Sequence, residues 1–142
     1  MRYEKNGNYF VIKLEKGDRL IENLAKFCER EKIKAGCLSG IGGAERLEVA
    51  YYSLKDKKYH SKIFSRPPFE ILSLAGNVSI SEGQVKIHAH VAFSDSEFRV
   101  YGGHLNEATV FPMCEIILMP LKKTLERKRD DETGLYMLDL PS

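Results

Sequence analysis

The sequence predicts an α+β domain in which one principal helix packs on a mainly antiparallel sheet or partial barrel. Residues 19–33 carry apolar side chains at helical spacing, whereas much of the remaining chain alternates apolar and polar residues with the period of two that is typical of strands. The length of 142 residues suits one domain, and no repeat or low-complexity linker divides it. We therefore expect a single domain over residues 1–142.

The first predicted strand covers residues 8–14, which are rich in β-branched and aromatic side chains, and Gly17 ends it. Asp18 is a candidate N-cap for the helix that follows. This helix presents one apolar stripe to the sheet and a charged face to solvent, and we expect it to end near Ile33. The stripe consists of Leu20, Ile21, Leu24, Phe27 and Cys28.

Strands are expected along the rest of the chain. The segment Arg66-Pro67-Pro68 predicts a break between two of them, because proline cannot donate a hydrogen bond to a ladder. The basic residues at 127–129 are followed at once by acidic ones, which indicates a solvated turn in a closing hairpin rather than an arm that binds nucleic acid. The stretch 35–54 is broken by glycines in its first half and has a strand pattern at 47–54. The other expected strands are 58–64, 69–80, 84–94, 97–106, 109–121, 124–128 and 135–140.

The composition excludes several classes of protein. Hydrophobic residues make up 43% and charged residues 30% of the chain, a balance typical of soluble globular domains, and the net charge of +2 is too small to indicate nucleic-acid binding by itself. No apolar run approaches the ~18 residues of a membrane span, and the N-terminus lacks the apolar core of a signal peptide, so we expect a cytoplasmic protein with no membrane partner. Three cysteines without a C-x-x-C pair predict reduced thiols, which excludes a disulfide scaffold and a cysteine-type zinc finger.

Residues 85–104 contain three of the four histidines. Apolar side chains alternate with His88 and His90 along residues 85–93, so both histidines are expected on the face of the strand that points away from the core. Their Cα atoms should lie about 6.5–7 Å apart. Two imidazoles at this spacing can converge on one cation.

A hairpin would bring His104 to the same patch. If Asp95-Ser96 forms the centre of the turn, His104 lies opposite Ile87 or His88, where facing Cβ atoms are about 4.5–5.5 Å apart. Three neutral imidazoles with an open fourth position suit Zn²⁺, at Zn–N distances of about 2.0–2.1 Å, and they also suit other first-row divalent metals. The alternative interpretation is that these are polar-face histidines without a metal.

Glu70 and Glu115 are candidate acid–base residues. Glu70 shares one face of its predicted strand with Leu72 and Leu74. Glu115 shares one with Met113 and Ile117, so each carboxylate is expected on an apolar face. A carboxylate on such a face is costly unless it is paired or hydrogen-bonded. The functional interpretations are a metal ligand, a hydrogen-bond partner of a histidine, or a general base. The alternative is a satisfied structural carboxylate or a subunit-interface residue.

Four segments of the chain carry a further signal, and they are Leu38-Ser39-Gly40-Ile41-Gly42, Phe69-Glu70-Ile71-Leu72-Ser73-Leu74-Ala75-Gly76-Asn77, His88-Ala89-His90 and Gly102-Gly103-His104-Leu105. Together they resemble the plants-and-prokaryotes conserved (PPC) domain, which in plant nuclear proteins is fused to AT-hook DNA-binding motifs. They occur in the family's order and cover nearly the whole chain. The resemblance implies a compact α+β domain that assembles as a homotrimer. In prokaryotic members the histidines of H-x-H and G-G-H resemble a metal site, which implies the same role for His88, His90 and His104.

Two departures from the plant members limit what the resemblance implies. An AT-hook needs an Arg-Gly-Arg-Pro core for the minor groove, and the chain contains none, so the plant mode of DNA binding is not implied. Plant members contact partner proteins through a Gly-Arg-Phe-Glu-Ile-Leu segment. Here residues 69–72 match it, but Pro67-Pro68 replace its first two positions, so partner binding through this segment is not implied either.

Three functions are compatible with these observations. The first is a metal-containing (zinc) homotrimeric module that binds or regulates without catalysis, with copies of itself as partners and DNA or a protein as a further candidate partner. The second is a zinc-dependent hydrolase or lyase, because three histidines leave a fourth position at which water is activated. The third is a DNA-binding regulator without an AT-hook, against which the net charge of +2 argues. The lack of a nucleophile–base motif favours the first function.

Overall fold

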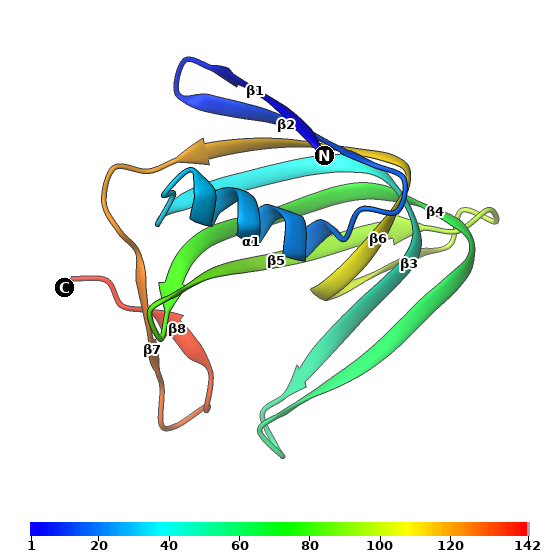
Figure 1. Cartoon of the computed structure of the whole chain (residues 1–142). Coiled ribbons are helices and arrows are strands. Elements are labelled where there is room, and N and C mark those ends of the chain that lie inside the picture. Colours follow the sequence, from blue (N-terminus) through cyan, green and yellow to red (C-terminus); the bar gives the residue numbers. More distant parts are fainter. Residues whose placement is uncertain (142) are drawn as a thin grey trace.

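The structure, a computed structural model, describes residues 1–141, and it describes the side chains of all of these except 66 and 67. Eight strands and one helix lie in this range (Figure 1). The predicted α+β class is confirmed, since the helix packs against a mostly antiparallel sheet. The elements are β1 (Arg2–Asn6), β2 (Tyr9–Glu15), α1 (Leu20–Arg30), β3 (Gly36–Ser53), β4 (Lys58–Ser81), β5 (Gln84–Ser94), β6 (Val100–Pro120), β7 (Glu126–Arg129) and β8 (Tyr136–Leu138).

The strands form one mixed sheet that is partly closed. Its order is β1-β2-β6-β3-β4-β7-β8, and β5 pairs with both β4 and β6. Within residues 1–141, β4 and β7 pair in parallel and the other pairs are antiparallel. Figure 1 shows the long strands curving around α1. The closure brings β5 and β6, which carry the clustered histidines, against each other.

Strand β4 continues through the segment where the prolines predict a break, so that prediction is wrong. Its pairing with β3 passes from Phe69 opposite Ala44 to Ser65 opposite Arg46, with a shift of register between these pairs. An irregularity of this kind tolerates residues that cannot donate to the ladder. Strand β4 is therefore continuous, and only its register with β3 shifts at this point.

Strand β6 is continuous where the sequence predicts two strands, at 97–106 and 109–121. It begins at Val100, after a loop of residues 95–99. The carboxylate of Asp95 organises this loop, because its Oδ1 accepts hydrogen bonds from the backbone N–H of Glu97 at 2.9 Å and of Arg99 at 3.1 Å. This loop, in place of a tight turn at residues 95–96, sets the register between β5 and β6.

The N-terminal hairpin contains a strand that the sequence does not predict. Every residue of β1 is exposed, so the strand has no buried apolar face that a period of two could reveal. It forms because it pairs along its length with β2, from Arg2 opposite Lys13 to Asn6 opposite Tyr9. The predicted strand at 8–14 corresponds to β2.

Helix α1 covers the sheet with the apolar stripe that the sequence predicts, although it ends at Arg30 and not near Ile33. Lys32, just beyond it, has a φ of 56°, a left-handed conformation that stops the helix. The α1 side chains that are at most 1% exposed pack into the core against the inner face of the sheet, and burying each large one contributes about 1.5–3 kcal/mol. These buried side chains are Leu20, Leu24, Phe27 and Cys28.

The structure has one helix in residues 1–141. Its 11 residues are too few and too polar to cross a membrane.

The predicted N-cap of α1 is wrong. The Asp18 carboxylate accepts a hydrogen bond from the Glu15 N–H at 2.8 Å and lies 2.9 Å from the N-terminal ammonium group. The helix is instead capped from β6 by Glu107, whose oxygens accept hydrogen bonds from the N–H groups of Ile21 at 2.8 Å and Glu22 at 3.2 Å. A residue far away in the sequence therefore supplies the acceptors that an N-cap supplies locally.

Candidate metal centre

Strand β5 places His88 and His90 on one face, as the period of two predicts. Ile87, Ala89 and Val91 are at most 5% exposed and belong to the core. His88 is half-buried and His90 is exposed on the opposite side of the strand. Burial of the apolar residues therefore fixes the direction in which both imidazoles point.

His104 of β6 pairs with His90, and not with Ile87 or His88 as the sequence predicts. The predicted register is wrong because residues 95–99 form a longer loop than a two-residue turn. The observed partner, His90, is two residues from the predicted partner His88, and residues two apart lie on the same face of a strand. His104 therefore still lies on the face that carries His88 and His90.

Two glycines allow β6 to approach its neighbours just before His104. A Cβ added to Gly102 would lie 2.7 Å from the carbonyl oxygen of Val91 in β5. A Cβ added to Gly103 would lie 2.9 Å from the carbonyl oxygen of Ala50 in β3. Any larger residue would push β6 away from one of these strands, so the glycines help to place His104 beside β5.

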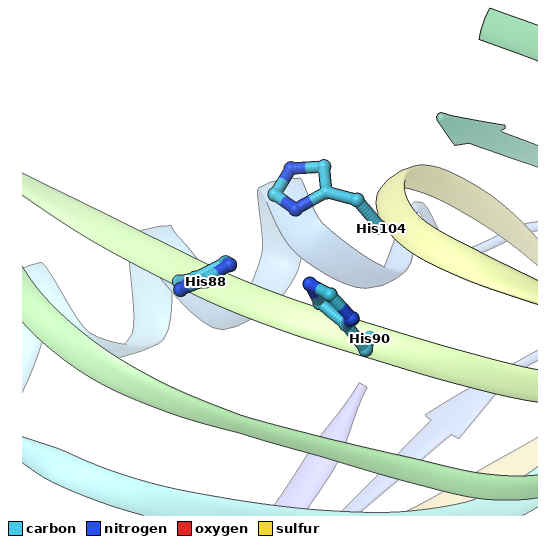
Figure 2. Close-up of side chains that lie close together, drawn as sticks. All are labelled: His88, His90 and His104. Atoms are coloured by element: carbon cyan, nitrogen blue, oxygen red, sulfur yellow. The ribbon is translucent and has the colours of Figure 1, made fainter. Parts of the chain in front are cut away.

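The three imidazoles converge on a common space (Figure 2). Their ring centroids are 5.3 Å apart for His88 and His90, 5.2 Å for His88 and His104, and 5.5 Å for His90 and His104. Each residue offers one nitrogen, and these three nitrogens all lie within 4.8 Å of one another. Figure 2 shows one nitrogen of each ring turned toward the space between the rings.

This set of nitrogens fits a tetrahedral metal ion. Zinc bound at about 2.0–2.1 Å keeps its ligand nitrogens about 3.4 Å apart, so the three nitrogens need to approach one another by at most about 1.4 Å. Small rotations about the side-chain torsions of the three histidines can supply movements of that size. Three imidazoles leave at least one position of the ion open to water or to a ligand.

Burial and neighbouring positive charges keep two of the imidazoles neutral. Burial lowers the pKa of His104 to about 4, with further contributions from the charges of His88, His90, Lys86 and Arg127. Burial also lowers the pKa of His88, with Arg127 as the next cause. Neutral imidazole is the form that binds metal ions, and both residues are in that form at neutral pH.

Arg127 of β7 is a residue of this site that the sequence analysis missed. Its Nε donates a hydrogen bond to Ser79 Oγ at 2.8 Å, and its Nη1 donates one to the Tyr136 carbonyl oxygen at 2.7 Å. Its Nη2 donates to Asn77 Oδ1 at 2.9 Å and lies 3.1 Å from His88 Nδ1. Because a guanidinium group only donates, Nδ1 of His88 accepts in this contact and the ring proton resides on Nε2.

The contact between Arg127 and His88 bears directly on metal binding. A ring nitrogen binds a metal through its lone pair, which in this tautomer is on Nδ1, beside the guanidinium. Binding through Nε2 requires the ring proton to move to Nδ1 and the hydrogen bond to be released. The sequence carries no signal of this role, because Arg127 belongs to a charged run; the prediction that the run is solvated is wrong at Arg127, which is half-buried.

The histidines lie in a hollow of about 960 Å³. Its walls come from the long strands β3 to β6 and from the C-terminal hairpin of β7 and β8. Aromatic rings continue from the cluster along one wall, with Tyr59 at 5.1 Å from His104 and Tyr52 at 4.8 Å from Tyr59, measured between ring centroids. The charged side chains in the lining are Lys57, Glu82, Lys86 and Arg127.

Glu70 and Glu115 are both exposed and lie outside the described lining of this hollow. The prediction that Glu70 shares an apolar face is wrong, because β4 shifts register against β5 between Ile71 and Ser73, and the shift changes which residues face the core. Glu115 faces outward from β6, opposite Lys13 of β2. The fold therefore brings the three histidines together and leaves both carboxylates elsewhere.

Comparison with known protein families matches most of the chain. The family described as the Plants and Prokaryotes Conserved (PCC) domain matches residues 1–122. These residues include the helix, strands β1 to β6 and the three histidines of the cluster. The C-terminal hairpin lies beyond the matched range.

Similar proteins of known structure share the fold over nearly the whole chain. A metal-containing protein from Archaeoglobus fulgidus is 36% identical, with a TM-score of 0.87 and 99% of each chain covered. A protein from Bacteroides thetaiotaomicron that is proposed to bind DNA is 28% identical, with a TM-score of 0.93, 97% of this chain covered and 96% of that chain covered. Among curated proteins, the bifunctional protein GlmU of a Synechococcus strain is 29% identical over 134 residues; the match covers 92% of this chain but 20% of GlmU.

Proposed function

Because the chain belongs to the Plants and Prokaryotes Conserved (PCC) domain family, we propose that it is a metal-binding module built on that domain. The resemblance found in the sequence is thus confirmed at the level of the family. The proposed metal is zinc or another first-row divalent ion, and the proposed ligands are His88, His90 and His104. The observation that carries the proposal is the convergence of three ring nitrogens within 4.8 Å of one another. The metal-containing relative from Archaeoglobus fulgidus supports it.

The proposed role of the module is binding or regulation without catalysis. When bound, the metal supplies a Lewis-acidic position that a ligand can occupy. A hydrolase or lyase would also need a base close to the reacting atoms. Among the described residues that line the hollow, Glu82 carries the one carboxylate that could act as such a base. Its Oε1 accepts a hydrogen bond from the Tyr136 hydroxyl at 2.9 Å. The enzyme alternative therefore rests on the open metal position alone.

Elemental analysis of untagged protein, prepared without chelators, tests the metal site. We expect near-stoichiometric metal in the wild type and its loss in both His88→Ala and His104→Ala. His60→Ala is the matched control, because His60 is exposed, lies outside the cluster and pairs with Asp56 at 2.9 Å. If the wild type holds no metal even after reconstitution with zinc, the proposal is wrong and the histidines are polar-face residues.

DNA binding is the second candidate function, and the relative from Bacteroides thetaiotaomicron supports it. A net charge of +2 gives one chain little attraction for phosphates, so binding would depend on basic side chains from several copies. Titration with duplex DNA over a range of salt concentrations tests this. Affinity that falls steeply as salt rises is the expected signature, and lack of binding at low salt excludes the function.

The module is further proposed to be a homotrimer located in the cytoplasm. Val11, Ile41 and Ile117 expose 43%, 58% and 44% of their surface beside Glu115, on the outer face of β2, β3 and β6. A cluster of exposed apolar side chains is typical of a subunit interface. Three copies is the number that the family resemblance implies. The three cysteines are free thiols, which suits a reducing compartment.

A further inference from the structure

The hollow around the histidines carries more positive than negative charge. Among the described residues that line it, Lys57, Lys86 and Arg127 are cationic, and Glu82 is anionic. Glu82 is already engaged by the Tyr136 hydroxyl. In the described lining, three cations therefore face one carboxylate, and the balance is positive.

Two of these cations lie beside the proposed metal ligands. Lys86 precedes His88 by two residues on β5, so its side chain leaves the same face of the strand. Arg127 Nη2 lies 3.1 Å from His88 Nδ1. A divalent ion held by three neutral imidazoles would add two more positive charges to this half-buried place. Repulsion between like charges is strong where water is partly excluded, so an anion at the open position would stabilise the occupied site.

The rest of the hollow suits an apolar body attached to that anion. Tyr59 and Tyr52 extend an aromatic wall away from His104, and the C-terminal hairpin adds Leu135 and Met137 on another side. The volume of about 960 Å³ lies within the range of about 300–1,000 Å³ that is typical of small-molecule sites.

We infer that the hollow binds a small organic anion, a carboxylate or a phosphate on an apolar and preferably aromatic body. Its anionic group occupies the open position of the metal beside Lys86, and its body lies against Tyr59 and Tyr52. This inference rests on the proposed function, because the metal held by the three histidines is part of the binding site. It names the class of ligand that the module takes.

Cobalt(II) is a suitable probe, because its visible absorption changes when a ligand enters its coordination sphere. The cobalt-loaded protein is titrated with benzoate, with phenyl phosphate and with benzamide, which has the shape of benzoate without its charge. We expect the two anions to change the spectrum and to bind about tenfold or more tightly than benzamide. By reciprocity, a saturating anion should raise the affinity for cobalt by the same factor by which cobalt raises the affinity for the anion.

Lys86→Gln tests the role of the positive charge at this position, because it removes the charge and leaves the three proposed metal ligands in place. We expect it to weaken binding of the anions about tenfold and to leave binding of benzamide unchanged. Lys26→Gln, at an exposed position of α1 outside the described lining, is the matched control and should bind like the wild type.

The outcomes separate the two proposals. If cobalt binds through the histidines but neither anion changes its spectrum or its affinity, this inference is wrong and the metal site stands. Equal binding of benzoate and benzamide, or no effect of Lys86→Gln, also overturns the inference. If cobalt does not bind at all, the proposed function fails and the inference fails with it.

Discussion

His104, one of the proposed metal ligands, is held in its neutral form by its surroundings. Burial and the neighbouring positive charges lower the pKa of its imidazole to about 4, so the ring is neutral at physiological pH. The same environment that repels a proton leaves the nitrogen lone pair free for a metal ion. Lowering the pH therefore has two effects on this residue. Protons compete with a metal ion for the ring nitrogen, and a protonated ring is less stable in its half-buried position.

The first prediction concerns the stability of the metal-free protein in acid. An unfolded histidine keeps its pKa near 6.5, whereas in the folded chain the pKa of His104 is about 4. Between these values the unfolded chain binds the proton more readily, so the stabilisation present above about pH 6.5 is lost as the pH falls toward 4. Urea unfolding at about pH 7 and about pH 4.5 should show a loss about 1–2 kcal/mol larger in the wild type than in His104→Gln. Equal losses in the two proteins would contradict it.

At the scale of elements, one buried carboxylate joins the helix to the sheet. Glu107 is 7% exposed and accepts hydrogen bonds from the N–H groups of Ile21, Glu22 and Ala108. Arg19 approaches it at 3.5 Å. A negative charge at the first turn of a helix satisfies its free N–H groups and interacts favourably with its dipole. This contact therefore holds α1 at a defined place on β6.

The second prediction follows from that contact. Glu107→Ala removes the acceptors and leaves the N–H groups of the first turn of α1 without their partners, so we expect the free energy of unfolding to fall by about 1–3 kcal/mol. Urea unfolding measures the change. Glu22→Gln is the control, because Glu22 lies on the exposed face of the same helix in surface ion pairs, and it should leave stability almost unchanged. A Glu107→Ala protein as stable as this control would refute the cap.

The C-terminal hairpin is the element that links the wall of the hollow to His88, a proposed metal ligand. Its strand β7 pairs with β4 at Ile80 and Ser81, and the Tyr52 hydroxyl donates a hydrogen bond to the Thr133 carbonyl oxygen at 2.5 Å. From β7, Arg127 reaches across to His88. The hairpin and the tautomer of His88 are therefore coupled.

The third prediction tests this coupling. In the metal-free wild type we expect His88 to carry its proton on Nε2, because Arg127 donates to Nδ1. Arg127→Met has no donor, so the proton should distribute over both nitrogens and zinc affinity should rise about tenfold or more. The nitrogen chemical shifts of the imidazoles in NMR spectra report the tautomer directly, and His60 serves as the internal reference. A proton on Nδ1 of His88 in the wild type would show that the hydrogen bond does not form.

At the scale of the whole molecule, the exposed apolar cluster around Glu115 leads to the fourth prediction. We expect light scattering with size-exclusion chromatography to give the mass of three chains for the wild type. Ile41→Lys places a charge in the cluster, where Ile41 exposes 58% of its surface, and should dissociate the assembly. Leu54→Lys, at a residue that is 65% exposed at the tip of the β3–β4 hairpin, is the control and should stay assembled. A wild type that is monomeric at micromolar concentration would rule out the homotrimer.

Patterns with a short period predicted a good part of this molecule. The stripe of α1 and the alternation along β5 are visible in the sequence, because burial selects apolar side chains on one face of a regular element. Strand β1 could not be predicted in this way, since none of its residues is buried. The prolines predicted a break that the structure replaces with a shift of register, because a long twisted strand can absorb an irregularity that a local rule counts as an end.

The sequence by itself determined which side of β5 carries His88 and His90, because the direction of a side chain in a strand depends only on whether its position is odd or even. Tertiary structure alone decided the residue that His104 faces, since the pairing register depends on the conformation of the loop at residues 95–99. It also decided that Glu107 caps α1 and that Arg127 contacts His88. Both contacts join residues that are distant in the sequence, and no local periodicity records which distant segments the closure of a sheet brings together.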